Sequence, residues 1–381
     1  MLQDPRERIV RGLEDVLICE SRVSDVDGAR GVLTYRGYDI HDLAAHATYE
    51  EAAWLLLEGE LPSPAEREAF TRQLAAARAV PESVFTALAA LPRTAHPMAL
   101  LRTAVSALGC TDPMEAHLSP EQLRRAGTGL IAQMGTLCAG LWRIRQGKSP
   151  IAPDPQLGHA ANFLFMLFGT EPTPVAARTM DVALVLHADH EVPASTFSAM
   201  AVLSSLADCY SAVTAAIGSL KGPLHGGANE AVLRTLEQIG GPAKVTAYLD
   251  AVQAKKGKIP GIGHRVYKTY DPRAAIFKRY AAEAGKQPAL AQLYATAAEL
   301  ERQCLERFGA KQLFPNVDYF SGIVYKGLDI DPAMFTPIFA LARIAGWVAR
   351  LVEYLPENRL FRPRALYVGP APRAYVPPER R

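Results

Sequence analysis

The feature that most constrains the fold is a long succession of helix signals with little strand signal between them. From Thr48 onward, segments rich in alanine and leucine follow one another, and many of them end at a glycine. Thr48 with Glu51, and Ser63 with Glu66, have the spacing of a capping box, in which two side chains bond to free N–H groups at a helix start. Glycine then ends a helix without strain. We therefore predict an all-α protein.

Residues 20–40 are the exception to this helical pattern. Asp-Gly and Gly turns surround a short β-branched and aromatic run there. Such a run between turn residues predicts a small N-terminal β-hairpin.

The segment 334–354 is an apolar helix interrupted by arginines. A charge within an apolar stripe must be paired or must face a ligand, so Arg343 is a candidate for ligand binding. Arg350 lies nearer the charged end of the same helix, and we expect it to be solvated.

Composition indicates an ordinary soluble globular protein. The chain has 381 residues, of which 49% are hydrophobic and 21% charged, and its net charge of +2 is too small to indicate a nucleic-acid partner. The five cysteines form no CxxC pair, which favours free thiols in a reducing compartment. The N-terminal segment has no apolar core of a signal peptide, and no long uncharged apolar run indicates a membrane span. We expect a cytoplasmic protein.

The stretch 261–273, GIGHRVYKTYDPR, carries the strongest chemical signal. Gly261 and Gly263 allow the backbone to approach a ligand closely, because no Cβ stands in the way. His264 can donate a hydrogen bond at neutral pH, and Arg273 can grip a carboxylate with its planar fork. The alternative is a plain loop with a core histidine.

A second stretch, residues 186–191, holds two histidines three positions apart. This spacing places His187 and His190 on one face of a helix. With Asp189 or Glu191 they offer the ligands of a zinc site, which is one alternative.

Two further stretches, 221–230 and 314–322, each contain one candidate residue. His225 precedes a predicted helix, whose positive end disfavours an imidazolium and leaves a neutral donor. The alternative for His225 is helix capping. Asp318 has apolar neighbours, which raise the pKa of a carboxyl toward that of a general base, although most loop aspartates only form turns.

Taken together, these stretches resemble the citrate synthase family in its short bacterial or archaeal form. GPLHGGANE, GxGHRVYKxxDPR, PNVDxxSG and a C-terminal RPxxxYVG occur in the family's order over nearly the whole chain. The resemblance implies a two-domain helical fold, with a large domain of residues 1–222 and 326–381. A small, mobile domain of residues 223–325 closes over it.

The resemblance also implies an acyltransferase of the tricarboxylic acid cycle that condenses acetyl-CoA with oxaloacetate, without a metal or cofactor. Asp318 would remove the methyl proton, His225 would stabilise the enolate and His264 would polarise the ketone. The implied oxaloacetate contacts are His187, His190, His264, Arg273, Phe339, Arg343 and Arg362. The implied CoA contacts are Ile259, Pro260, Gly261, Ile262, Gly263, Lys268, Lys311 and Asn316.

In the family, the arginine that matches Arg362 comes from the partner subunit of a homodimer. Two positions depart from the family pattern. Pro193 stands where related short forms carry asparagine, and Lys268 stands where other members carry arginine, which loses the bidentate fork. We also expect no allosteric NADH site of the kind found in longer hexameric relatives, because the helical pattern begins within the first few dozen residues.

Three other functions remain open at this point. A 2-methylcitrate synthase, which uses propionyl-CoA, shares every motif, and one methylene changes specificity by only about 1–3 kcal/mol. A metal-dependent hydrolase on His187 and His190 would lose activity with a chelator. A helical scaffold without catalysis would bind neither CoA nor oxaloacetate.

Overall fold

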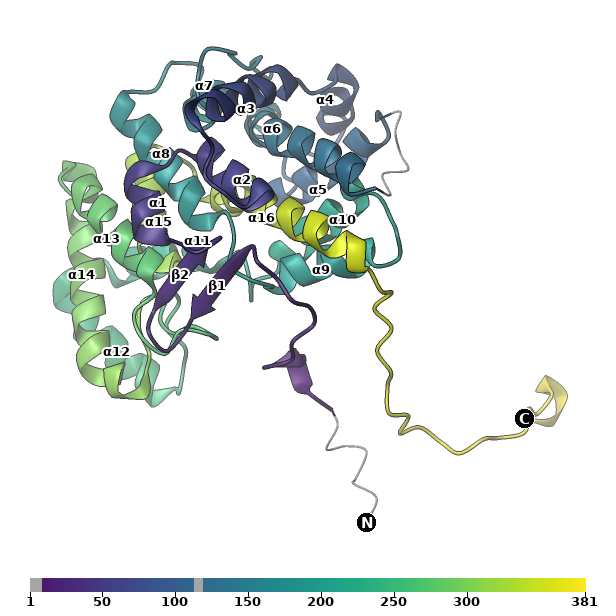
Figure 1. Cartoon of the computed structure of the whole chain (residues 1–381). Helices are drawn as coiled ribbons and strands as arrows, with labels where there is room; N and C mark the ends of the chain where they lie inside the picture. The colour runs from purple at the N-terminus through teal and green to yellow at the C-terminus, as the bar shows by residue number, and fades with distance from the viewer. Residues whose placement is uncertain (1–8, 113–118) are drawn as a thin grey trace.

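The computed structural model describes residues 9–112 and 119–381 of the chain, and these residues form a predominantly helical body (Figure 1). The main part is built from the first ten helices and the last one. They are α1 (Ile40–His46), α2 (Tyr49–Glu58), α3 (Pro64–Ala77), α4 (Glu82–Ala89), α5 (Pro97–Gly109), α6 (Pro120–Arg145), α7 (His159–Phe168), α8 (Pro174–His187), α9 (Ala194–Leu203), α10 (Cys209–Leu220) and α16 (Phe335–Tyr354). The all-α prediction is confirmed.

The predicted capping signals do start helices. Thr48 with Glu51 makes a full capping box at α2, and Ser63 with Glu66 makes another at α3. Gly59 ends α2 in the left-handed conformation, with φ of 97°. Local sequence therefore decides where these helices begin and end.

The β-structure near the N-terminus has three strands instead of the predicted two. β1 (Ser24–Asp27), β2 (Val32–Tyr35) and β3 (Tyr38–Asp39) form an antiparallel meander in which Ser24 pairs with Tyr35 and Thr34 with Asp39. The third strand was missed because it has only two residues and runs directly into α1.

Helix α16 forms the centre of the main part. It contacts α2, α5, α6, α8, α9 and α10, and it runs through the middle of the ribbon in Figure 1. By length and composition the stretch Pro332–Glu357 resembles a membrane span, but 94% of its most apolar window is buried inside the protein. It therefore provides the hydrophobic surface on which the other helices pack.

The expectation that Arg350 is solvated was wrong. Its side chain is 3% exposed, and Nη2 lies 3.0 Å from Oδ2 of Asp189, just beyond α8. Nη2 also donates to Oγ of Ser24 in β1 at 2.8 Å. A partner 161 residues away thus accounts for a buried charge that the local pattern placed in water.

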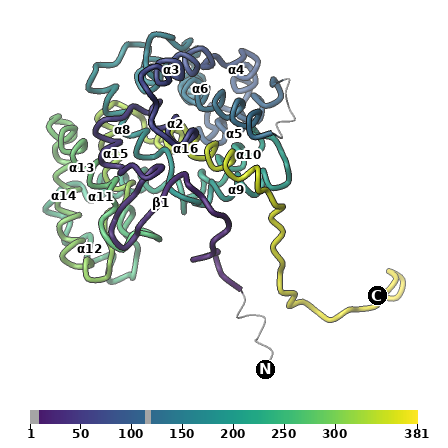
Figure 2. Tube along the Cα trace, in the orientation of Figure 1, coloured from purple at the N-terminus to yellow at the C-terminus, as the bar shows by residue number. Residues whose placement is uncertain are grey.

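A second group of helices packs together at one side of the main part, where it appears as the green block of Figures 1 and 2. Its members are α11 (Ala228–Ile239), α12 (Val245–Ala254), α13 (Pro272–Ala284), α14 (Pro288–Phe308) and α15 (Asp318–Gly327). They fall within the predicted small domain, residues 223–325, except that α15 runs two residues beyond it. The exact division and the mobility of this domain stay predictions.

Candidate active site

The glycine loop between α12 and α13 is held against the segment before α15. Gly263 N donates to Phe314 O at 2.7 Å, and Ile262 forms an antiparallel bridge with Pro315. Gly261 has a φ of 75°, and a Cβ there would lie 2.6 Å from Cγ2 of Val232. Only glycine fits this position, because both the backbone conformation and the available space exclude a side chain.

His264, directly after this loop, is held in one tautomer. Its Nδ1 accepts hydrogen bonds from the backbone N–H groups of Val266 at 3.0 Å and Tyr267 at 3.2 Å. Burial, aided by the charge of Arg273, lowers the pKa of His264 to about 4. The ring is therefore neutral at pH 7 and carries its proton on Nε2, where it can donate to a ligand.

His190 lies beside His264, with ring centroids 5.3 Å apart. Its Nε2 is 3.2 Å from the hydroxyl of Tyr267. Burial and then the charge of Arg273 hold the pKa of His190 well below its ordinary value, so this ring is neutral too. The two neighbouring rings thus form a pair of neutral imidazoles.

The prediction that His187 and His190 lie on one face of a helix was wrong, because α8 ends at His187. His187 Nδ1 donates to Ala183 O at 2.9 Å within its own helix, and the ring packs edge-on against Phe339 at 4.7 Å. His187 is fully buried. The structure therefore places it behind Phe339, while His190 reaches the loop of His264.

His225 lies two residues before Gly227, the N-cap of α11, and that helix start has no side-chain cap. The ring is therefore not a capping group. Its Nε2 is 2.8 Å from Oγ of Ser195, which in turn accepts a hydrogen bond from Nε1 of Trp347 at 3.2 Å. With the serine hydroxyl donating to Nε2, the neutral ring carries its proton on Nδ1. Burial and then the charge of Arg343 lower the pKa of His225 to about 4.

Asp318 is the first residue of α15 and is 8% exposed. Its backbone N–H donates to Oδ1 of Asn316, but its carboxylate Oδ1 is buried without a hydrogen-bond partner among the residues described. Burial raises the pKa of Asp318 to about 7, although the charge of Arg273 acts in the opposite direction. The carboxyl group is thus poised to exchange a proton near neutral pH.

Two buried arginines bring positive charge to this cluster. Arg273 bonds to both oxygens of Asp271, from Nε at 3.1 Å and from Nη2 at 2.8 Å. Arg343 donates from Nε to His187 O at 2.7 Å and lies over the ring of Phe339, 4.8 Å from its centroid. Burial lowers the pKa of Arg343 to about 10, which still leaves it charged at pH 7.

The other candidates for CoA binding lie around the glycine loop. Asn316 donates from Nδ2 to Gly263 O at 2.9 Å and accepts from Asp318 N at 3.0 Å, so it connects the loop to the carboxylate. Lys268 and Lys311 are exposed at the surface. Ile259 and Pro260 are partly buried at the start of the loop.

Arg362 is the predicted site residue that the single chain does not bring to the cluster. It lies in the C-terminal tail, which extends away from the body in Figure 2, and its Nη1 donates to Pro363 O at 2.9 Å. Pro193, one of the two residues expected to depart from the family pattern, is the N-cap of α9 and makes no side-chain cap there.

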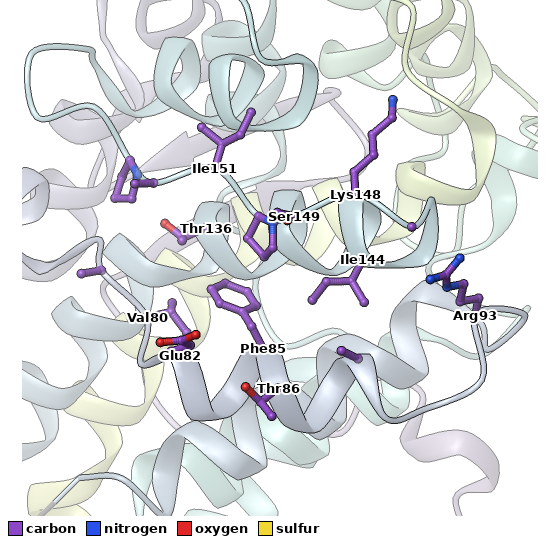
Figure 3. A pocket seen from close by; sticks show the side chains of 16 residues that line it. Val80, Glu82, Phe85, Thr86, Arg93, Thr136, Ile144, Lys148, Ser149 and Ile151 are labelled. Atoms are coloured by element: carbon purple, nitrogen blue, oxygen red, sulfur yellow. The ribbon is translucent and has the colours of Figure 1, made fainter.

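No group of three or more histidine, cysteine, aspartate or glutamate side chains arranged to hold a metal occurs within residues 9–112 and 119–381. A separate hollow of about 640 Å³ lies between α4, the end of α6 and residues 147–153 (Figure 3). Its lining is largely apolar, with Phe85 and Ile144 facing one another, and it includes none of the predicted site residues.

Several residues of the site were missed from sequence. Ser195 and Tyr267 contact histidines through their hydroxyls, and Trp347 donates its indole N–H to Ser195. Such groups carry no chemical signature of their own in a sequence. Tyr267 did have one signal, because it lies within the stretch 261–273. Asp271 precedes Arg273 in the same motif, but its two bonds to the arginine became visible only in the fold.

The chain matches known proteins over nearly its whole length. The family profile described as "Citrate synthase, C-terminal domain" matches residues 12–364. A citrate synthase of Deinococcus radiodurans is 46% identical, over 97% of this chain and 98% of that protein.

Solved structures agree with this match. A citrate synthase from Pyrobaculum aerophilum has a TM-score of 0.93 at 45% identity, covering 98% of this chain and 95% of that one. Another, from Thermoplasma acidophilum, was solved as a ternary complex with carboxymethyl coenzyme A and oxaloacetate. It has a TM-score of 0.94 at 39% identity, covering 98% of this chain and 99% of that one. The chain belongs to the citrate synthase family.

Proposed function

We propose that this protein condenses acetyl-CoA with oxaloacetate and water to give citrate and CoA, as an acyltransferase that converts the acyl group to an alkyl group on transfer. The observation that carries the proposal is the buried carboxyl of Asp318, whose pKa is about 7 and which lies in the field of Arg273 and Arg343. Arg273 also acts on neutral His190 and His264, and Arg343 acts on neutral His190 and His225. The substrate pair is supported by the Thermoplasma relative, which was solved with oxaloacetate and a CoA analogue.

The first step is removal of a proton from the methyl group of acetyl-CoA by the carboxylate of Asp318. A carboxyl with a pKa near 7 is a stronger base than an ordinary aspartate and is still substantially ionised at neutral pH. His225 donates from Nδ1 to the thioester oxygen, on which negative charge develops. Ser195 keeps that proton in place by occupying Nε2.

In the second step the enolate carbon attacks the ketone carbon of oxaloacetate. His264 donates from Nε2 to the ketone oxygen and stabilises the alkoxide that forms. The product is citryl-CoA, with one new carbon–carbon bond. Water then cleaves the thioester and releases citrate and the CoA thiol.

The carboxylates of oxaloacetate are bound by guanidinium groups. Among the residues described, Arg343 has Nη1 and Nη2 available beside its bond to His187 O, and Arg273 has Nη1 available beside its pair with Asp271. His190 adds a neutral N–H donor, with Phe339 and His187 packed behind Arg343.

The remaining guanidinium is supplied by Arg362 of the partner subunit, which makes the active protein a homodimer. The support is the position of this residue on a tail that leaves its own body, as Figure 2 shows, and whose apolar side chains Leu360, Tyr367 and Val368 are exposed in the single chain. An exposed apolar segment of this kind fits a second copy of the chain.

We place CoA along Ile259–Gly263, with Asn316 beneath the loop and Lys268 and Lys311 toward the phosphates. Closure of residues 223–325 over the rest of the chain shields the enolate from water. No cofactor takes part, and the five free cysteines fit a cytoplasmic location.

Steady-state kinetics with oxaloacetate as acceptor test this function. We expect a higher kcat/KM for acetyl-CoA than for propionyl-CoA, and no loss of activity when EDTA is present. A preference for propionyl-CoA would instead make the protein a 2-methylcitrate synthase. Loss of activity with EDTA, restored by a divalent metal, would favour a metal-dependent enzyme.

A further inference from the structure

Tyr267 contacts both histidines of the neighbouring pair, each in a different way. Its hydroxyl lies 3.2 Å from Nε2 of His190, and its backbone N–H donates to Nδ1 of His264 at 3.2 Å. Its ring centroid is 4.9 Å from that of His264 and 5.5 Å from that of His190. The guanidinium of Arg273 lies over the ring of Tyr267, 5.9 Å from its centroid.

The direction of the hydrogen bond between Tyr267 and His190 follows from the surroundings of the phenol. Tyr267 is 1% exposed, and its hydroxyl proton has one acceptor within reach among the residues described, Nε2 of His190. If the phenol oxygen accepted instead, its own proton would be buried without a partner, which is unfavourable. An unprotonated imidazole nitrogen is also a stronger base than a phenol oxygen.

Both groups stay neutral, so this direction does not change near pH 7. Burial raises the pKa of Tyr267 above its usual value, and burial with the charge of Arg273 holds the pKa of His190 low. A neutral imidazole that accepts at Nε2 carries its proton on Nδ1.

We propose that Tyr267 is a positioning residue that holds His264 and His190 in opposite tautomers. Its backbone N–H, with that of Val266, leaves the proton of His264 on Nε2. Its hydroxyl places the proton of His190 on Nδ1. His264 then presents an N–H donor with no acceptor among the residues described, and the N–H of His190 interacts only with the backbone of His190 itself among those residues.

The consequence for binding rests on the proposed function, in which both rings contact oxaloacetate. Oxaloacetate offers only acceptor oxygens, so each ring must present a proton to it and not a lone pair. Without the phenol, His190 would populate both tautomers, and part of the protein would turn a lone pair toward the anion. Tyr267 therefore favours binding of an anionic keto acid without touching it.

The tautomers can be read directly in the unmodified protein with ring-¹⁵N-labelled histidine and two-bond ¹H–¹⁵N correlation spectra. The signals are assigned by their loss in His190→Gln and His264→Gln variants. We expect His190 to show a bare Nε2 and a protonated Nδ1, and His264 to show the reverse. A protonated Nε2 on His190 overturns the proposal, whatever the activity of the protein.

A matched pair of variants tests the effect on binding. Tyr267→Phe removes the hydroxyl and keeps the ring, whereas Tyr270→Phe removes a hydroxyl in the same loop that bonds to Glu301 at 2.5 Å, away from the histidines. We expect Tyr267→Phe to mix the tautomers of His190 and raise KM for oxaloacetate roughly 3- to 10-fold, the effect of one hydrogen bond, with kcat changed less than about twofold.

Tyr270→Phe should leave the His190 spectrum and KM for oxaloacetate unchanged. Equal effects of the two variants, or an unchanged tautomer in Tyr267→Phe, would show that the hydroxyl contributes only to general stability and would overturn the proposal. A protein that forms no citrate at all contradicts the proposed function instead, and the spectra of the unmodified protein still decide the role of Tyr267.

Discussion

The chemistry of single residues in this site depends on burial more than on local electrostatics. Asp318 begins α15, where the positive end of a helix lowers the pKa of a carboxyl. Its pKa is nevertheless raised to about 7, because the loss of water on burial outweighs the effects of both the helix and Arg273.

A raised pKa alone does not identify a site, however. Burial also raises the pKa of Asp181 to about 7, and that carboxylate accepts from the backbone N–H of Tyr49 in the core.

The pH dependence of catalysis should follow the ionisation of Asp318. The base is active only when ionised, so kcat/KM for acetyl-CoA should fall as the pH drops below about 7, approaching tenfold per pH unit. His225 and His264 have pKa values of about 4 and add nothing to the profile between pH 5.5 and 8. A rate that stays flat down to pH 5.5 would mean that the base has an ordinary carboxyl pKa.

The same raised pKa predicts that Asp318 reduces stability. Because the folded-state value lies above the unfolded value of 3.8, the free energy of unfolding declines as the pH rises from about 4 to about 7. Asp318→Asn has no such charge, so at pH 8 its free energy of unfolding should exceed that of the unmodified protein by about 2–4 kcal/mol. Denaturant unfolding at pH 8 and pH 4 measures this. An equal difference at both pH values would rule out ionisation as its cause.

Individual residues were predictable where the motif is continuous in sequence. His264 and Arg273 lie within thirteen consecutive residues, 261–273, so their proximity needed no knowledge of the fold. Tyr267 lies in the same stretch, but its role depends on His190, 77 residues away in sequence. Contacts between residues so far apart in the sequence are set by tertiary packing, so the pattern of a single segment does not predict them.

At the scale of elements, Arg350 connects α16 to β1 and to the end of α8. Its ion pair with Asp189 is almost fully buried, and Asp189 directly precedes His190. The sequence pattern identified α16 correctly as an apolar helix. It could not show which of its charges meets a partner elsewhere in the fold.

Replacing Arg350 should therefore be costly. Arg350→Met leaves the carboxylate of Asp189 buried without its counter-charge, and we expect a loss of about 3–5 kcal/mol in the free energy of unfolding. Arg72→Met is the matched control, because Arg72 pairs with Glu68 at an exposed site, and it should change stability by less than about 1 kcal/mol. Similar losses in the two variants, measured by denaturant unfolding, would contradict a special role for the Arg350–Asp189 pair.

Helix boundaries explain which predictions about the helices were right and which was wrong. The spacing of His187 and His190 indicated one helix face, but α8 ends at His187 and separates the two rings. The capping boxes at Thr48 and Ser63 were predicted correctly, because all of their partners lie within one turn. Signals within one turn can thus be seen in the sequence, whereas the end of α8 at His187 has no glycine to mark it.

At the scale of the whole molecule, the proposed site is complete only in a dimer. If Arg362 acts in the partner's site, Arg362→Ala and Asp318→Asn homodimers should each be nearly inactive. A mixed dimer has one site with both changes and one site with neither. Subunit exchange between the two variants should therefore recover up to about a quarter of full activity, given random pairing and independent sites. If exchange is verified and no activity returns, Arg362 acts within its own chain.

The central claim is that this chain forms a carbon–carbon bond through Asp318. The most direct test follows the products of methyl-¹³C acetyl-CoA and oxaloacetate by NMR, for the unmodified protein and for Asp318→Asn. We expect the label in a methylene carbon of citrate, with CoA released in equal amount, and a kcat at least about 100-fold lower for Asp318→Asn at nearly unchanged oxaloacetate affinity. Label found in acetate, or an Asp318→Asn variant that keeps more than about a tenth of the rate, would contradict the claim.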